Sequence, residues 1–258
     1  MSIHDGHRNR MKQRFLNDGL EHFQPHEVLE LLLFYCIPRQ DTNGIAHSLL
    51  ERFGTLEGVF SARVSELSKV PGIGENAATF LSLVAAASRY YEVSRHSNDR
   101  PLNSIEECAA VLRPYFTARR NEMVYLLCLD AKGKAIACRF VGEGSVNSAA
   151  VPIRRIVEMA LADNATSVVL AHNHPHGIAV PSGSDMEMTD HFNSAFQLIG
   201  IPLVEHIIVA DDQFCAVMKQ RCGTFRRSPV SGKIECGFYE KFYDVDDAEW
   251  RASPIFEE

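Results

Sequence analysis

The sequence lacks the features that mark several large classes of protein. No apolar run reaches the roughly 18 to 20 residues that cross a bilayer, so we expect no membrane contact. The N-terminal stretch MSIHDGHRNRMKQRF has no apolar segment behind it and is unlike a secretory signal. The seven cysteines are odd in number and form no C-x-x-C pair, which argues against a cysteine-based zinc ribbon and for reduced thiols. We therefore expect a cytoplasmic protein.

Positive charge is also scarce. The formal net charge is -7, so the chain as a whole has no attraction for nucleic acid, and any such binding needs a local patch. The one basic cluster, Arg8, Arg10, Lys12 and Arg14, fits a solvated helix face equally well. With 258 residues, of which 46% are apolar, the chain has room for one large domain or two small ones.

Residues 1–95 have a helical apolar period. The segment PHEVLELLLFYC begins with Pro25, a good residue for a first helical turn, and IAHSLLERFG ends with Gly54, a good helix terminator. The polar stretch HSNDRPLN at 96–103 breaks this period. We predict an all-helical N-terminal domain that ends before this stretch.

From residue 103 to 222 strand-like and helical segments alternate, which is typical of an α/β domain. EMVYLLCLD, AIACRFVGEG and SVVLAH read as strands, and IPLVEHIIVADDQFCAVM reads as a strand pair. VPIRRIVEMALADN and SDMEMTDHFNSAFQLIG have a helical period. Residues 223–258 contain aromatics but little periodicity, and we predict an irregular C-terminal tail.

Two histidines and an aspartate stand around a loop broken by proline and glycine, in AHNHPHGIAVPSGSD. His172 and His174 are two residues apart, so an extended backbone sends both imidazoles to the same side. Asp185 can return to them from the start of the next helix. Two nitrogens and a carboxylate oxygen suit zinc and leave a fourth position for water. A structural reading also exists, because Ser184 and Glu187 have the spacing of a capping box.

The string His172-x-His174, seven residues, Ser182, two residues, Asp185 resembles the JAMM motif of JAB/MPN metalloproteases. The wider stretch GSVNSAAVPIRRIVEMALADNATSVVLAHNHPHG, followed by LVEHIIVA, resembles bacterial RadC-like proteins. The resemblance implies a cytidine-deaminase-like α/β fold that binds one Zn²⁺ per chain through His172, His174 and Asp185. It also implies that Ser182 hydrogen-bonds the oxyanion and that an upstream glutamate handles the catalytic proton.

Three glutamates compete for that last role. Glu122 stands at the start of a strand, fifty residues before His172, where the resemblance places it. Glu143 in VGEGSV is the competitor, and Glu205 beside His206 is a weaker one. Glu122 also fits a solvated strand start.

The sequence departs from the usual RadC-like strings at two positions. His176 stands where HNHPSG would have serine, and Arg155 stands where a glutamate is common. Neither is one of the four motif residues, although His176 offers an additional imidazole near the ion.

The stretch VPGIGENAATF resembles a helix-hairpin-helix. Gly72 and Gly74 around Ile73 permit a tight turn whose backbone amides can meet a phosphate. However, residues 1–100 hold eleven Lys/Arg against twelve Asp/Glu, and Glu75 stands where a phosphate would approach. A hairpin that packs or docks a protein is therefore the stronger reading, with weak binding of duplex DNA as the alternative.

Two function hypotheses follow. The first is a zinc-dependent hydrolase of peptide or isopeptide amide bonds that acts on a protein or peptide substrate. The second is a DNA-associated binding protein in which the JAB/MPN domain is only a scaffold. The sequence favours the first, because the four-residue site is complete and the chain is acidic.

DNA binding separates the two hypotheses. We expect residues 1–95 to bind duplex DNA no more tightly than the non-specific range, a Kd of about 10⁻⁴ to 10⁻⁶ M at physiological salt, because few cations face a phosphate. Glu75→Lys should tighten binding by adding one cation at the hairpin. Fluorescence anisotropy at several salt concentrations measures both, and nanomolar binding at physiological salt would favour the DNA scaffold.

Overall fold

The computed structural model describes residues 3–96, 100–144, 152–175, 177–227 and 234–241. The chain divides into two compact units, residues 1–91 and 92–258. Among the described helices, none combines the length and the apolar character that a bilayer span requires.

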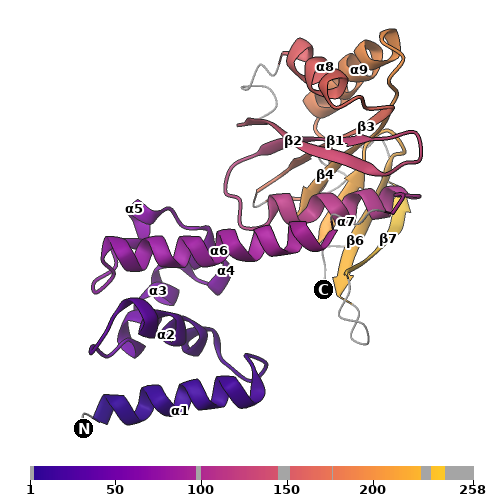
Figure 1. Ribbon diagram of the computed structural model, residues 1–258. Coiled ribbons are helices and arrows are strands. Elements are labelled where there is room, and N and C mark those ends of the chain that lie inside the picture. The colour runs from indigo at the N-terminus through magenta and orange to yellow at the C-terminus, as the bar shows by residue number, and fades with distance from the viewer. Residues whose placement is uncertain (1–2, 97–99, 145–151, 176, 228–233, 242–258) are drawn as a thin grey trace. The chain divides into compact units, whose positions relative to one another are not determined.

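The first unit is helical, as the sequence predicts (Figure 1). Its helices are α1 (Ile3–Asp18), α2 (Pro25–Cys36), α3 (Asn43–Phe53), α4 (Leu56–Ser61), α5 (Val64–Leu67) and α6 (Glu75–His96), the last of which continues past the unit boundary. Pro25 opens α2, where the absence of its N–H costs no helical hydrogen bond, and Gly54 closes α3 with φ 77°. The core of this unit includes several residues with no exposed surface: Leu29, Leu33, Ala46, Leu49, Val59, Leu67, Ala78 and Leu81.

Two residues of the basic cluster serve to attach α1 to its neighbours. The Arg8 guanidinium donates to the carbonyls of Ile37 at 2.8 Å and Gln40 at 2.6 Å. Arg14 makes two bonds to the Glu27 carboxylate, at 2.7 and 2.9 Å, and thereby lowers the pKa of Glu27 to about 2. Guanidinium groups that already have protein partners have fewer donors left for phosphates. These contacts favour the structural reading of the cluster.

The predicted hairpin lies between α5 and α6. The N–H of Ile73 donates to the Val70 carbonyl at 3.0 Å, and Ile73 is buried in the core of the first unit. Gly72 has φ +87° and faces Ile45 of α3. Because α5 has only four residues, the helix-hairpin-helix itself stays a prediction. What the structure shows is a turn that packs against α3.

The second unit contains a sheet. Its described strands are β1 (Met123–Leu129), β2 (Ala135–Glu143), β3 (Ser167–Asn173), β4 (Leu203–Ala210), β5 (Gln213–Ala216), β6 (Arg221–Arg227) and β7 (Ile234–Lys241), in the order β2-β1-β3-β4-β5-β6-β7. Among these described strands only β3 and β4 pair in parallel, which requires a crossover between them. That crossover is the helix α9 (Gly183–Leu198).

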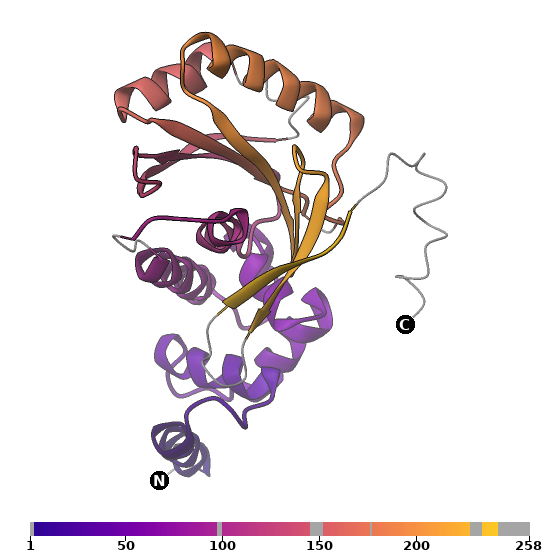
Figure 2. The ribbon, with the colours of Figure 1, turned by 90° about the vertical axis from the view of Figure 1, so that its right-hand side faces the viewer.

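Helices cover both faces of this sheet, so the predicted α/β class is confirmed. The helices α8 (Ile153–Ala162) and α9 lie on one face, and α7 (Ile105–Phe116) lies on the other (Figures 1 and 2). The helix α7 was not predicted from the sequence. A signal was present: the Ser104 hydroxyl accepts from the N–H of Glu107, and the Glu107 carboxylate accepts from the N–H of Asn103.

The prediction of an irregular chain from residue 223 onward is wrong for the described part of that segment. β6 pairs with β5, and β7 pairs with β6, so the sheet continues to Lys241. The sequences RCGTFRR and IECGFYEK contain no long apolar run, so periodicity alone does not mark these strands, and their pairing with the neighbouring strands defines them. Residues 242–258, where the predicted tail continues, lie outside the described residues.

We expect Gly72→Ala to lower the free energy of unfolding by about 1–3 kcal/mol. An added Cβ would lie 2.7 Å from Ile45 Cδ1, and φ +87° is strained for alanine. Gly74→Ala is the matched control, because nothing lies within 4 Å of its added Cβ. Urea denaturation of the full chain measures both. Equal effects of the two variants would contradict this account of the turn.

Candidate metal centre

The two histidines lie where β3 ends. His172 is the last-but-one residue of β3 and has no exposed surface. His174 follows the strand, and its N–H donates to the Val209 carbonyl at 2.9 Å, which continues the pairing with β4. This extended backbone brings the two Nε2 atoms to 3.0 Å from each other. The predicted convergence of the imidazoles is present.

Asp185 approaches from the first turn of α9. The helix begins after Ser182, whose hydroxyl donates to Asp185 Oδ2 at 2.6 Å and whose N–H donates to the same oxygen at 2.8 Å. The capping pair is therefore Ser182 with Asp185, and the expected pair Ser184 with Glu187 is wrong. The helix α9 starts at Gly183, whereas a cap at Ser184 would require it to start at Asp185, two residues later.

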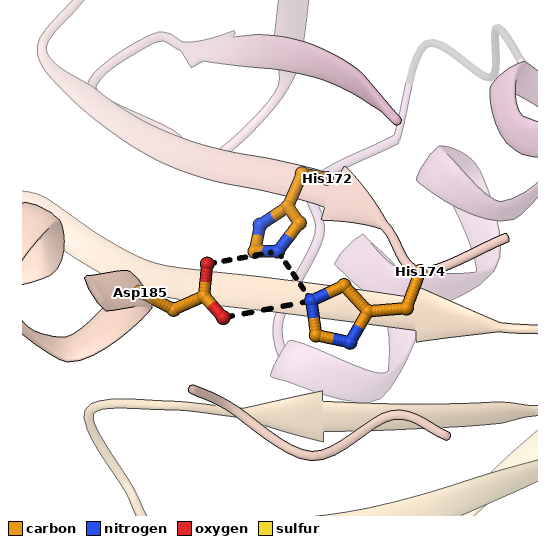
Figure 3. A group of neighbouring side chains, drawn as sticks. All are labelled: His172, His174 and Asp185. Atoms are coloured by element: carbon orange, nitrogen blue, oxygen red, sulfur yellow. Dashed lines mark hydrogen bonds and ion pairs between the residues drawn. The ribbon is translucent and has the colours of Figure 1, made fainter. Parts of the chain in front are cut away.

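The three side chains have the spacing of ligands around one ion (Figure 3). His172 Nε2 lies 3.2 Å from Asp185 Oδ1, and His174 Nε2 lies 3.5 Å from Asp185 Oδ2. Ligand atoms at zinc distances of about 2.0–2.2 Å in a tetrahedron stand about 3.3–3.5 Å apart. The donor set and its spacing thus fit one zinc ion with a fourth position left for another ligand.

The electrostatics of the site favour a cation. Burial would raise the pKa of Asp185, but its contacts with His172, His174 and Ser182 outweigh burial and hold that pKa well below its ordinary range. Asp185 is therefore an anion at neutral pH although it is only 3% exposed. A cation between the imidazoles and this carboxylate would be the natural counter-charge.

Each imidazole has a partner on its other nitrogen. His174 Nδ1 lies 3.0 Å from the Ile178 carbonyl, which can only accept, so Nδ1 carries the proton and Nε2 carries the lone pair. His172 Nδ1 lies 2.8 Å from Nε2 of the buried His206. This contact of His206 was not predicted from the sequence. Its signal was its place on β4, the parallel neighbour of β3.

Glu122 lies at the strand start next to the histidines. β1 pairs with β3 so that Val124 stands opposite His172, and the continuation of this register places Glu122 opposite His174. Burial lowers the pKa of His174, but Asp185, the Ile178 carbonyl and Glu122 together raise it above its ordinary value. Glu122 is therefore close enough for its charge to act on the site.

Asn173, between the two histidines, holds the backbone around Glu122. Its Oδ1 accepts from the N–H of Met123 at 2.7 Å, and its Nδ2 donates to the Asn121 carbonyl at 3.2 Å. The buried amide thus binds the residues on both sides of Glu122. The tripeptide HNH thus contains two candidate ligands, His172 and His174, and an asparagine that holds the backbone on both sides of Glu122.

The other two glutamates are placed less well. Glu143 is exposed at the end of β2, one strand farther from β3 than β1 is, and accepts from the Asn121 amide. Glu205 and His206 are successive residues of β4, so their side chains point to opposite faces of the sheet. Because His206 contacts His172, Glu205 points away from the site, and its carboxylate accepts from the N–H of Met218.

Some residues named from the sequence cannot be compared with the site. His176 and residues 145–151 lie outside the described residues. Arg155 is in α8, on the same face of the sheet as α9, and its side chain is exposed. Gly72, Ile73 and Gly74 belong to the first unit.

Comparison with known proteins identifies the family of the chain. A family profile described as RadC-like JAB domain matches residues 102–223. A UPF0758 protein of Fusobacterium nucleatum is 32% identical over 83% of this chain and 96% of its own length. The chain belongs to the RadC-like UPF0758 family. A second UPF0758 protein, from Ruegeria pomeroyi, is 34% identical over 79% of this chain and 91% of its own length.

For this RadC-like chain we expect about one zinc per chain when it is purified without chelator, because two imidazoles and a carboxylate have the spacing of one ion. Asp185→Ala should lose most of the metal, since it removes the anionic ligand. His191→Ala, an exposed histidine on the same helix, is the control and should keep it. Elemental analysis of folded protein measures all three. Zinc that survives Asp185→Ala would contradict the ligand set.

Proposed function

We propose that this chain is a zinc-dependent hydrolase of peptide or isopeptide amide bonds. One observation carries the proposal: two imidazole nitrogens and an ionised carboxylate lie at the spacings of a three-ligand zinc site, with a glutamate beside them. Three protein ligands and an open fourth position are typical of catalytic rather than structural zinc. The family resemblance to JAB/MPN metalloproteases supports the same reaction class.

His172, His174 and Asp185 would hold the ion. Bound zinc acidifies water toward a pKa of about 7 and polarises a carbonyl oxygen. Glu122 would accept the proton of the attacking water and deliver it to the nitrogen of the leaving amine. Because Glu122 is not a ligand, it can accept and release a proton without changing the coordination of the ion.

Ser182 would turn its hydroxyl proton from Asp185 Oδ2 to the oxyanion, while its N–H keeps the bond to Oδ2. Its hydroxyl lies 2.6 Å from the Asp185 carboxylate and 2.9 Å from Ser184 Oγ, so it stands beside the ion position. Loss of an oxyanion donor typically costs about a hundredfold or more in rate. Ser182 also caps α9, so this one residue links the start of the helix to the reaction.

The alternative proposal is a DNA-associated binding protein with the JAB domain as a scaffold. It receives less support from the structure than from the hairpin motif. Arg8 and Arg14 bind groups of their own unit, and Gly72 packs against Ile45. The anisotropy titration described above decides between these readings.

A comparison of two glutamate variants tests the proposal. Glu122→Gln should keep zinc and fold while losing about 10²–10⁴-fold in hydrolysis, because it removes the proton acceptor but no ligand. Glu143→Gln, on the exposed end of β2, should keep activity. Each variant is incubated with native bacterial lysate, and new N-terminal and lysine amines are labelled and quantified by mass spectrometry, with His172→Ala as the background.

Two outcomes would contradict the proposal at different points. If Glu143→Gln is inactive and Glu122→Gln is active, the proton-transfer residue has been misassigned. If the zinc-loaded wild type releases no more amines than His172→Ala, amide hydrolysis is wrong and the scaffold reading gains support.

A further inference from the structure

A buried chain of hydrogen bonds runs from His172 back to the helix that carries Asp185. His172 Nδ1 lies 2.8 Å from His206 Nε2, and His206 Nδ1 lies 2.6 Å from Thr189 Oγ1. The Thr189 hydroxyl in turn lies 2.6 Å from the main-chain carbonyl of Asp185. His206 has no exposed surface and Thr189 is 4% exposed, so bulk water does not substitute for any of these partners.

The last link determines the direction of all the others. A carbonyl oxygen can only accept, so the single hydroxyl proton of Thr189 points to the Asp185 carbonyl. Thr189 Oγ1 must then accept from His206, which places the proton of that neutral ring on Nδ1. His206 Nε2 is left with a lone pair and accepts from Nδ1–H of His172. His172 therefore carries its proton on Nδ1 and its lone pair on Nε2, the atom that faces Asp185.

We propose that His206 and Thr189 are positioning residues that hold His172 in its metal-binding tautomer before an ion arrives. The inference rests on the metal centre proposed above. The chain closes on itself, because Asp185 supplies both the carbonyl that orients Thr189 and the carboxylate that faces His172 Nε2. The packing of β3, β4 and α9 therefore determines which nitrogen of His172 carries the proton.

The two candidate ligand histidines reach the same tautomer by different routes. A carbonyl orients His174 directly, as is common around metal sites, whereas His172 is oriented by a second imidazole. An imidazole alone can present either a donor or an acceptor. Thr189 removes that choice. Without its hydroxyl, His206 can place a proton on Nε2, and the His172 proton then moves to its own Nε2, where zinc must displace it.

The first test uses zinc affinity, measured by competition with a chromophoric chelator on full-length protein. Thr189→Val keeps the side-chain shape but removes the hydroxyl, and should weaken zinc binding about 10- to 100-fold. Thr189→Ser retains the hydroxyl and should bind within a few-fold of wild type. Circular dichroism establishes that both variants are folded. Equal affinity of folded Thr189→Val and wild type would overturn the inference.

The second test needs no metal, and its result is read from the wild type. Histidine side-chain ¹⁵N spectra of the metal-free wild type, recorded at mildly alkaline pH, report which ring nitrogen of each histidine carries the proton. His206→Gln and His172→Gln assign the signals. We expect Nδ1–H on both His172 and His206, and a ring of either residue without a proton on Nδ1 overturns the inference.

The outcomes separate this inference from the proposed function. If wild type binds zinc and Thr189→Val binds it equally well, the metal centre stands and the positioning role fails. If wild type binds no zinc while both rings carry Nδ1–H, the proton arrangement is correct but the metal-binding role proposed for it fails together with the hydrolase.

Discussion

A buried, ionised carboxylate is the constraint on which the second unit depends. Asp185 is only 3% exposed, and a carboxylate removed from water must have a partner for each oxygen. The hydroxyl and N–H of Ser182 donate to Oδ2, and the two imidazoles at the end of β3 lie 3.2 and 3.5 Å from the carboxylate oxygens, where a cation between them would complete the set of partners. Because the partners come from a strand and a helix start, the strand end and the helix start must lie together. The groups that surround the Asp185 carboxylate therefore also form the candidate cation site.

Side chains of the central strands alternate between the two faces of the sheet. On the α8 and α9 face, side chains from β3 and β4 meet in the pair His172 and His206. On the α7 face, apolar residues such as Leu127, Val169 and Ile207 pack into a core. Strand alternation keeps Glu205 on the second face, although it is the sequence neighbour of His206. The polar network around the candidate ion shares its face with a second apolar cluster, which includes Leu126 and Leu170.

In the first unit, residues whose sequence pattern suggests phosphate binding make contacts within the unit instead. Arg8 and Arg14 resemble a phosphate-binding cluster in the sequence, but they bind main-chain carbonyls and Glu27. Gly72 resembles part of a nucleic-acid hairpin, but its missing Cβ makes room for Ile45. These contacts explain the residues without a ligand. The residues with the spacing of metal ligands lie in the second unit, at the end of β3 and the start of α9.

The sequence by itself determined the features that depend on short-range order. The spacing of His172, His174 and Asp185, the extended backbone before the loop and the helix after it are local, so their convergence could be predicted from strand and helix periods. The change of period near residue 103 likewise separated a helical region from an α/β region. The missed helix α7 had a local signal too, the Ser104 and Glu107 cap.

Only the tertiary structure decided which distant residues meet. The pairing of β6 and β7 depends on a neighbouring strand rather than on an apolar run, so a weak pattern concealed them. The contact of His206 with His172 depends on the parallel pairing of β3 and β4, and the place of Thr189 depends on how α9 crosses the sheet. A single sequence records the donors and acceptors of these side chains. Their proton directions follow only when the fold brings each donor within bonding distance of one acceptor, since hydrogen bonds act over a few ångströms and not along the chain.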